Sequence, residues 1–366
     1  MRVLIAVLTS LSLLAASLSG GKGSLQFYVV DVEGGNATLI ITPSGESLLL
    51  DTGHLNAAAR DAGRIIEAMN DAGVKQIDHL ITTHWHLDHF GGMAELARQV
   101  PIREFIDHGP SIQRNTKADA FLKNIYPALY GKAKRTIVKP GDTIAITDLD
   151  VVVVTSAGKT IRAPLPAGGG PNTYCTDYSQ PVADTSENSQ SIGIHVRFGR
   201  FRAIHLGDLS ADKEFQLMCP ENRLGTVDLF IVSHHGQPNS NTKVLVDAIE
   251  SRVAIMNNGI RKGGEPEVMK VIYSAPGLEN LWQLHFSQLS GQEYTVPGIF
   301  IADLADRPQP TVPVDPMPPP AARTVQPPAP AHNGKAYWIK VSARQDGSFT
   351  VTNTRTNFSK TYRARS

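Results

Sequence analysis

The sequence predicts a mixed α/β sandwich whose loops gather at the ends of its strands. Short apolar and β-branched runs recur between residues 25 and 256, and one amphipathic helical pattern separates two of them. Hydrophobic residues make up 41% of the 366 residues, which suits a folded core. The formal net charge of +1 argues against a protein held on nucleic acid or anionic lipid by bulk charge.

The N-terminal third of the chain is expected to contain strands followed by a βαβ unit. The apolar residues of 57–70 recur at helical spacing, and Gly73 suits the end of that helix. Residues 77–83 are apolar and β-branched, as in a buried strand. The strands expected before this unit are 25–32, 37–41 and 47–50.

The remaining elements of the predicted sandwich are mostly strands. A helix is expected over 93–99, where Gly91 and Gly92 allow the chain to leave a tight turn. Strand-like runs then follow at 136–138, 143–155, 192–198, 202–206, 229–232 and 253–256.

Residues 1–23 have the layout of a secretory signal peptide. A positive charge at Arg2 precedes an apolar run from Val3 to about Leu18, which gives way to small residues. This run is short for a membrane span of about 20 residues, and an uncleaved anchor is the alternative interpretation. We therefore expect an exported protein, periplasmic or extracellular, with no stable membrane span after cleavage.

A proline tract divides the rest of the chain. Residues 24–305 are expected to form the main domain, and residues 306–334, with 10 prolines among 29 residues, a semi-rigid linker. Residues 335–366 alternate apolar and polar side chains around a hairpin turn at Asp346, and they carry seven Lys or Arg against that one acid. This basic, β-rich tail either grips a polyanion or docks on the main domain, since it is too small to hold a core alone.

Cys175 and Cys219 are the only cysteines of the chain. An even count in an exported protein permits one disulfide, and two cysteines cannot make a four-thiolate zinc site. Their spacing in the sequence leaves open whether they pair.

One histidine cluster carries the predicted chemistry. Directly after the 77–83 strand, the chain reads His84-Trp-His-Leu-Asp-His89. Three histidines and an aspartate within six residues are hard to explain by packing, whereas imidazole nitrogens and carboxylate oxygens are ligands that Zn²⁺ takes. In an extended segment His84 and His86 point the same way and can hold one ion together. The turn that follows can direct Asp88 and His89 toward a second position.

The His-x-His-x-Asp-His string after a buried strand resembles the metallo-β-lactamase superfamily. Other stretches are similar to one branch of it, the metallohydrolase domain of ComEC-type DNA-uptake proteins and their secreted stand-alone relatives. This likeness covers about residues 25–260 in order and excludes the proline tract and the tail. The stretches that carry it are Asp31–Ala37, Leu50–Gly53, Asn188–Ser191, Gly207–Asp208 and Ser233–Gly236.

The resemblance implies an αββα sandwich with a small C-terminal β appendage and a metal site at one edge of its two sheets. By this analogy His84 and His86 hold a first ion, while Asp88 and His89 hold a second. Asp208 bridges both ions, because a carboxylate has two oxygens and can span them.

Two positions of the implied ligand set stay open. His234 is the preferred residue to complete the second ion's shell, and His235 is the alternative ligand. Most of the superfamily uses another histidine for the first ion, where this sequence offers Asn188, as the ComEC-type branch does. An amide oxygen is a weaker zinc ligand than imidazole, which makes the first ion the less secure of the two.

Residues outside this set are weaker candidates. Asp51 either orients a ligand histidine or caps the turn into Gly53. Arg261 or Lys262 either faces a substrate anion or lies in a solvated turn. Packing is preferred to metal ligation for His195 and His205. Trp282 and His285 either wall the site or pack in the core, and packing is again preferred.

The expected activity is hydrolysis by a metal-activated water, with two Zn²⁺ per chain or with Mn²⁺ or another divalent ion. Asp88 or Asp208 takes the proton of that water, and His235 assists the leaving group. The resemblance favours phosphodiesters, either small-molecule or polymer esters, with nucleic acid among them. The alternatives are lactam or lactone hydrolysis, and a catalytically weak protein that binds polymer or metal. The sequence leaves the oligomeric state open.

Overall fold

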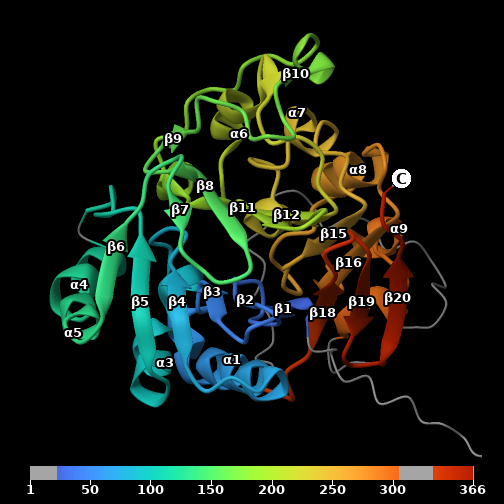
Figure 1. The fold of residues 1–366 in the computed structure, drawn as a ribbon. Coiled ribbons are helices and arrows are strands. Elements are labelled where there is room, and N and C mark those ends of the chain that lie inside the picture. Colours follow the sequence, from blue (N-terminus) through green and yellow to red (C-terminus); the bar gives the residue numbers. More distant parts are fainter. Residues whose placement is uncertain (1–22, 115, 305–332, 366) are drawn as a thin grey trace, which may run out of the picture.

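The computed structural model describes residues 23–114, 116–304 and 333–365, and two large sheets dominate this part of the chain (Figure 1). The strands of the first sheet are, in spatial order, β20 (Phe358–Tyr362), β19 (Phe349–Asn353), β18 (Trp338–Ala343), β1 (Leu25–Val30), β2 (Thr38–Ile41), β3 (Ser47–Leu50), β4 (Ile77–Ile81), β5 (Ile102–Asp107) and β6 (Lys134–Ile137).

The second sheet runs in spatial order through β17 (Ile301–Asp303), β16 (Asn280–His285), β15 (Val253–Met256), β14 (Leu229–Ile231), β12 (Phe201–His205), β11 (Gly193–Phe198), β8 (Asp150–Ser156) and β7 (Thr143–Ile144), with β9 (Lys159–Thr160) beside β8. A separate pair is formed by β10 (Gly170–Pro171) and β13 (Glu221–Asn222).

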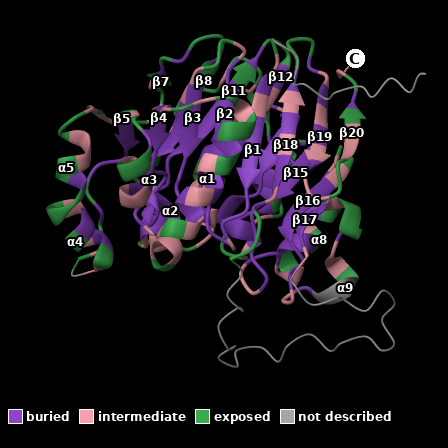
Figure 2. Ribbon diagram, turned by 90° about the horizontal axis from the view of Figure 1, so that it is seen from below, coloured by how far each residue is buried: buried purple, intermediate pink, exposed green. Residues whose placement is uncertain are grey.

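Helices cover the outer face of each sheet over its central strands, and Figure 2 shows these strands mostly buried, whereas β19 and β20 at one edge carry intermediate and exposed residues. The first sheet packs against α1 (Ala58–Ala72), α3 (Met93–Gln99), α4 (Lys117–Asn124) and α5 (Tyr126–Tyr130). The second sheet packs against α6 (Ala211–Met218), α7 (Lys243–Val246) and α8 (Pro266–Ser274). Shorter helices are α2 (Leu87–Phe90), α9 (Gly291–Tyr294) and the 3-10 turns η1 (Leu55–Ala57), η2 (Thr173–Cys175), η3 (Glu187–Gln190), η4 (Ser233–Gly236) and η5 (Gly298–Phe300).

Three apolar layers hold this arrangement together. Alternate residues of β1 show why: Phe27 and Val29 face the layer between the sheets, whereas Tyr28 and Val30 face the helices. Because both faces of each sheet are covered, central strands such as β2 and β15 are buried along their whole length. The predicted α/β sandwich is therefore confirmed as an αββα arrangement.

Local sequence signals account for several elements and fail at one. The predicted 57–70 helix is α1, which ends at Gly73 with φ 76°, a left-handed conformation that glycine adopts without strain. The predicted single strand 143–155 is wrong. Asp148 lies at φ 68° and turns the chain, so that β7 and β8 form an antiparallel pair.

The basic tail completes the first sheet. β18 pairs antiparallel with β1 from Leu25↔Ala343 to Val30↔Trp338, and Figure 1 shows the red strands beside the blue one. Ile339 and Val341 belong to the apolar layer between the two sheets. The C-terminal appendage is therefore part of the sandwich and shares its core.

The topology brings many loops to one edge. β3, β4 and β5 run parallel in the first sheet, and β12, β14, β15 and β16 run parallel in the second. Their carboxyl ends lead into the segments that carry the predicted ligands, as expected for sites in α/β folds. The two sheets therefore deliver these segments to a common edge.

Two sequence predictions concern the periphery. Cys175 and Cys219 form a disulfide that ties the loop after β10 to the end of α6.

The predicted signal peptide, residues 1–23, lies almost wholly outside the described residues, and so does most of the 306–334 linker. Within the described residues, every helix is too short or too polar to cross a bilayer.

Candidate metal centre

The histidine string occupies the loop after β4 and the short helix α2. After β4 the chain bends at His84 and Trp85, and His86 is again extended, with φ and ψ of −91° and 150°. Helix α2 then presents Asp88 and His89 from one turn. Gly91 follows where the backbone of Leu55 comes so close that no side chain fits. The close approach of Leu55 therefore requires glycine at position 91, two residues after His89.

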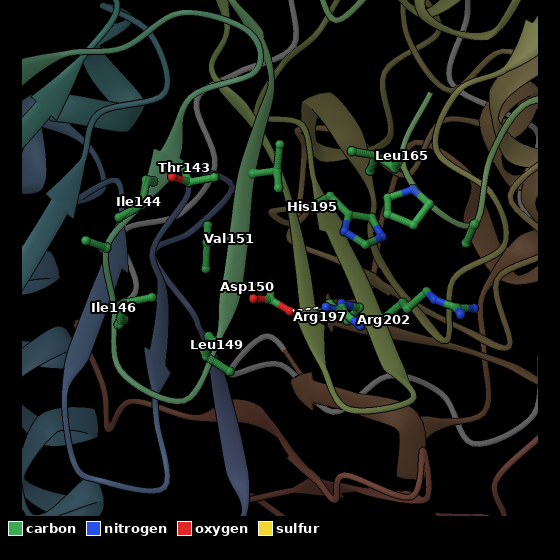
Figure 3. A pocket seen from close by; sticks show the side chains of 14 residues that line it. Thr143, Ile144, Ile146, Leu149, Asp150, Val151, Leu165, His195, Arg197 and Arg202 are labelled. Carbon is green, nitrogen blue, oxygen red and sulfur yellow. Dashed lines mark ion pairs between the residues drawn. The ribbon is translucent and has the colours of Figure 1, made fainter. Parts of the chain in front are cut away.

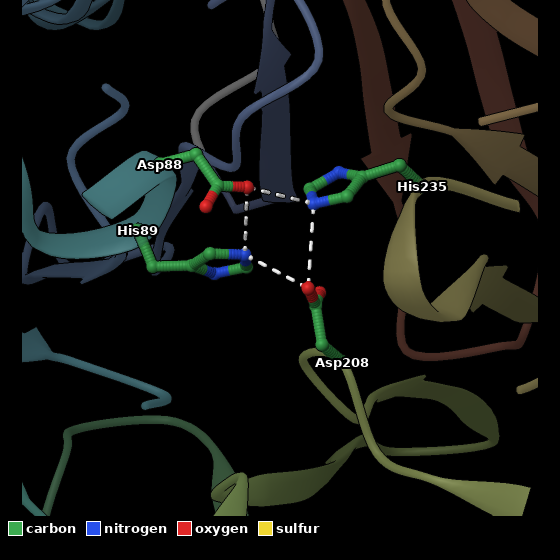
Figure 4. Close-up of side chains that lie close together, drawn as sticks. All are labelled: Asp88, His89, Asp208 and His235. Atoms are coloured by element: carbon green, nitrogen blue, oxygen red, sulfur yellow. Dashed lines mark hydrogen bonds and ion pairs between the residues drawn. The ribbon is translucent and has the colours of Figure 1, made fainter. Parts of the chain in front are cut away.

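Asp88, His89, Asp208 and His235 form the first of two ligand groups, which we call the carboxylate-rich group (Figure 4). Their candidate ligand atoms all lie within 4.8 Å of one another. The Asp88 Oδ2 atom is 3.2 Å from His235 Nε2 and 3.4 Å from His89 Nε2. Four inward-pointing N and O atoms at this spacing suit a divalent cation.

His84, His86 and Asp208 form the second ligand group, which we call the imidazole group. His84 Nε2 is 3.0 Å from His86 Nδ1, so the two rings converge as their spacing in the sequence predicts. His86 is partly exposed, whereas His84 is fully buried.

Asp208 belongs to both groups. It follows β12 through Gly207, which has φ 59° and lies so close to Thr83 that a side chain would collide with it. The distances from Asp208 Oδ2 to four imidazole Nε2 atoms are 3.1 Å for His89, 3.4 Å for His235, 3.6 Å for His234 and 3.7 Å for His84. The carboxylate therefore lies between the two groups, where the resemblance placed a bridging ligand.

His234 and His235 point to different places. Both have positive φ, 51° and 56°, so the chain turns sharply between their side chains. The structure puts His235 in the carboxylate-rich group and leaves His234 outside it, which reverses the order of preference given above. Helix and strand periodicity does not apply to two consecutive residues in the left-handed conformation. The sequence therefore could not show which of His234 and His235 points toward the carboxylate-rich group.

Asn188 lies next to His234. Its Nδ2 atom is 3.4 Å from His234 Nε2, and its Oδ1 atom is buried without a hydrogen-bond partner among the described residues. Neither residue belongs to the three-residue imidazole group. His234 Nε2 is 3.6 Å from Asp208 Oδ2, so His234 and its neighbour Asn188 lie beside the shared carboxylate.

Asp51 fixes one ligand histidine. Its carboxylate accepts from His89 Nδ1 at 2.7 Å and from the Thr83 hydroxyl and backbone N–H, also at 2.7 Å. A fourth donor is Asn36 Nδ2 at 2.8 Å. These contacts favour the Nδ1–H tautomer of His89 and leave Nε2 for a ligand. Of the two roles considered for Asp51, the contacts favour the orienting one.

Glu187 is a residue that the sequence analysis missed. It is fully buried and accepts from His108 Nε2 at 2.8 Å, from Ser111 Oγ at 3.0 Å and from the Ile112 N–H at 3.0 Å. The N–H of Trp85, between the two histidines of the imidazole group, also donates to it at 3.3 Å. Glu187 thus joins three loops around that group, and its position just before Asn188 was the one available signal.

The other candidates lie outside both groups. His205 is buried and its Nε2 is 3.3 Å from Asn36 Oδ1, and His195 lies on β11. Trp282 packs in the layer between the sheets, and His285 Nε2 is 2.6 Å from Asp31 Oδ1. His205, Trp282 and His285 therefore pack or pair within the fold, whereas His195 lies on the outer face of its strand.

A third acidic group also lies away from the two ligand groups. It comprises Asp31, Glu33, His285 and Asp303. Arg64 Nη1 is 2.9 Å from Asp31 and 3.0 Å from Glu33, and His285 adds a second basic partner. Because these basic groups already offset the acids, we interpret this cluster as structural.

The electrostatics of the centre favour a cation. Burial opposes ionisation of Asp88, but Lys262 and His89 hold the pKa of this carboxyl well below its ordinary value. Burial also opposes the charged form of His89, yet Asp208, Asp88 and Asp51 raise its pKa well above the ordinary value. The space around His89 Nε2 thus attracts positive charge, and a metal ion can take the place of the proton.

A pocket of about 550 Å³ opens beside the centre. His86 and Asp88 line it together with Gln113 and Lys117. Lys262, from the loop after β15, contacts Asp88 from another side. A substrate in this pocket would therefore meet one residue of each ligand group, His86 and Asp88, and the amine of Lys117.

The residues fit divalent cations on chemical grounds. The donors are imidazole nitrogens and carboxylate oxygens, the set that zinc takes. His235 Nε2, like Asn188 Oδ1, is buried without a hydrogen-bond partner among the described residues. Buried polar atoms without partners are costly, and ligation would satisfy them.

Comparison with known proteins agrees with this geometry. Residues 30–163 match the family model described as Metallo-beta-lactamase superfamily. Recombination protein 2 of Haemophilus influenzae is 27% identical over 239 residues, which are 65% of this chain and 25% of that protein. The match therefore spans about a quarter of the relative's length.

Solved structures are also similar. Igni18, a metallo hydrolase from the archaeon Ignicoccus hospitalis, has a TM-score of 0.41 at 15% identity, covering 70% of this chain and 94% of that one. Zn²⁺-bound PqqB from Methylobacterium extorquens has a TM-score of 0.40 at 12% identity, covering 64% and 89%. The family match, the αββα layers and the ligand string lead to one assignment: the chain contains a metallo-beta-lactamase superfamily domain.

Proposed function

We propose that the chain is an exported metal-dependent hydrolase that holds two divalent cations, zinc in the first instance, and cleaves phosphodiester-type esters. The observation that carries this proposal is the position of Asp208 Oδ2, at 3.1 to 3.7 Å from imidazoles of both ligand groups. A buried carboxylate shared in this way suits a ligand common to two ions about 3.5–4 Å apart.

The two groups divide the ligands between them. His84 and His86 hold one ion, His89 and His235 hold the other with Asp88, and Asp208 serves both. When bound, the cations lower the pKa of a water toward about 7 and withdraw charge from the scissile ester. Asn188 and His234 lie beside the imidazole group and are reserve ligands for its ion.

The chain's own residues position the reaction. Asp88 and Asp208 are ionised, and either can accept the proton of the attacking water. Lys262 contacts Asp88 with its side chain 36% exposed, so its ammonium can also reach a negative oxygen of the substrate. His235 is held as a ligand here, which argues against the leaving-group role considered for it above.

An anionic substrate suits the pocket. Asp88 is the one acid among its lining residues, and in this proposal that carboxylate is occupied as a ligand. Lys117 in the lining, and Lys262 in contact with Asp88, then remain as cations. The name of the Haemophilus relative ties that protein to recombination, and nucleic acid is therefore the first polymer to test as a substrate.

Export rests on two observations of this chain. Residues 1–23 have the signal-peptide layout, and Cys175 is bonded to Cys219. Disulfides form and persist in oxidising compartments such as the periplasm and the extracellular space.

Turnover of three model substrates tests the proposal. The zinc-loaded exported protein should hydrolyse bis-p-nitrophenyl phosphate faster than nitrocefin or a lactone. Asp177→Ala, at an exposed acid remote from the motifs, should leave that rate unchanged. Preference for nitrocefin or the lactone would instead support carbon-centred hydrolysis. Two bound zinc ions without turnover of any of the three would support the polymer- or metal-binding alternative.

A further inference from the structure

A second cavity, of about 520 Å³, lies on the outer face of the second sheet (Figure 3). Its floor is formed by β8, β11 and β12, and two chain segments, 143–149 and 165–167, form its walls. It shares no lining residue with the pocket beside the metal centre. Along β11 the lining residues His195 and Arg197 follow Ser191, whose hydroxyl accepts from the backbone N–H of Asp208, so one strand connects the cavity to the metal centre.

The floor of this cavity carries an unbalanced charge. Asp150, Arg197 and Arg202 are register partners on three neighbouring strands, so their side chains form one row on the same face. Asp150 pairs with Arg197. Among the described residues, no acid forms an ion pair with the Arg202 guanidinium.

The nearest other acid does not cancel this charge. Asp228 Oδ2 accepts from the backbone N–H of Arg202 at 3.0 Å. Its other oxygen, Oδ1, is 3.4 Å from Arg365 and 3.7 Å from Arg252. Two arginines directly opposite each other on neighbouring strands repel, and one surplus positive charge therefore remains in the row.

His195 adds a polar group to the same floor. It lies on β11 two residues before Arg197, on the same face, and is 5% exposed. Its Nε2 atom has no hydrogen-bond partner among the described residues. Burial, together with Arg202 and Arg197, lowers the pKa of His195 to about 4, so the ring is neutral at physiological pH. A neutral imidazole offers one donor and one acceptor.

The walls of the cavity are apolar. On the face that His195 and Arg202 share, the apolar lining residues are Val152, Leu165 and Pro166, of which Leu165 is labelled in Figure 3. Ile144, Ile146 and Leu149 also border the cavity, but they pack in the layer between the two sheets. A cavity of this size is typical of small-molecule sites, in which apolar walls surround a few polar groups. The walls therefore suit a ligand with an apolar chain or ring.

We propose that this cavity binds a small amphipathic monocarboxylate, whose headgroup pairs with Arg202 beside His195 and whose apolar part lies against Val152 and Leu165. The planar guanidinium matches a carboxylate through two parallel hydrogen bonds. One surplus positive charge matches a monoanion better than a phosphate dianion. This site is independent of the metal centre and of the reaction proposed for it.

Decanoate binding, measured by calorimetry on the exported full-length protein, tests this proposal. One saturable site is expected, with acetate binding at least tenfold more weakly because it leaves the walls empty. Arg202→Gln should weaken decanoate binding at least tenfold, and Ala145→Glu, which adds a negative charge at an exposed wall position, should do so as well. Arg98→Gln, on exposed α3 in another layer of the fold, is the matched control.

Three outcomes would overturn the proposal. One is the absence of saturable binding to the wild type. Another is equal affinity of the wild type, Arg202→Gln and Ala145→Glu, each checked for folding by circular dichroism. The third is loss of decanoate binding in Asp208→Ala or after zinc removal, which would locate the carboxylate on the metal centre.

Discussion

The two ligand groups share Asp208 but differ in how firmly their other members are held. In the carboxylate-rich group, His89 is fixed by Asp51 at 2.7 Å, and His235 Nδ1 is 3.2 Å from the carbonyl oxygen of Asn257. In the imidazole group, His86 is partly exposed, and the nearest atom to its Nε2 is Gln113 Nε2 at 3.3 Å. The carboxylate-rich group is therefore complete and rigid, whereas the imidazole group is more open.

This difference predicts that the two groups bind their ions with unequal affinity. Four ligands, of which both histidines have Nδ1 held by a partner, bind a cation more tightly than three ligands. Each group has one residue in the pocket lining, Asp88 and His86, and the more weakly held ion is the one better placed to exchange a ligand for substrate. Substitutions in and around the two groups should therefore change the difference in affinity between the two ions.

Asp208→Ala should have the largest effect, because it removes a ligand from both groups at once. Loss of about 4 kcal/mol of charge stabilisation corresponds to a fall of roughly 10³-fold in turnover. Metal analysis should show both equivalents reduced, while circular dichroism stays native. Full activity in this variant would refute the bridging position, and Asp177→Ala is its control.

His235→Ala and His234→Ala separate two neighbouring residues. His235 belongs to the carboxylate-rich group, so its loss should cost at least about 100-fold in turnover, beyond the range typical of residues that only orient ligands. His234→Ala should cost about tenfold or less and act on the ion of the imidazole group. Equal losses, or a larger loss for His234, would contradict the assignment from the structure.

Asp51→Asn should weaken metal binding without unfolding the protein. The amide cannot stabilise the His89 tautomer as the carboxylate does, and such changes typically cost about 10–100-fold in metal affinity. Competition with a chelator measures this affinity, and ¹⁵N spectra of the His89 ring report its tautomer. An unchanged tautomer together with unchanged affinity would reduce Asp51 to a turn residue.

Asn188→His should have the smallest effect and the opposite sign. Imidazole is a better zinc ligand than an amide oxygen, so the ion of the imidazole group should bind about tenfold more tightly. A two-site zinc titration would show the two affinities moving closer together. If the ion of the carboxylate-rich group were bound more tightly instead, the assignment of Asn188 to the imidazole group would be wrong.

The sequence predicted the parts of the centre that depend on local pattern. The extended segment that brings His84 and His86 together, and the turn that presents Asp88 and His89, follow from spacing and from the glycines behind them. The βαβ unit that carries them followed from periodicity. Local pattern was sufficient because each of these features is formed by one continuous stretch of the chain.

Features that depend on distant contacts could not be predicted in this way. Glu187 acquires its role from the 108–112 loop, and the division between His234 and His235 depends on two left-handed residues. The pairing of the tail with β1 joins residues more than 300 positions apart in the numbering, from Leu25 to Ala343. No short motif encodes such a pairing, although the alternating pattern of the tail correctly indicated strands.

Zinc titration of the metal-free exported protein, with bound metal counted by mass spectrometry, tests the central claim most directly. We predict two equivalents of unequal affinity for the wild type. The double variant His84→Ala/His86→Ala should retain one equivalent, namely the tighter one. Fewer than two sites in the wild type, or loss of the tighter site in the double variant, would contradict the claim that Asp208 joins two ion-binding groups.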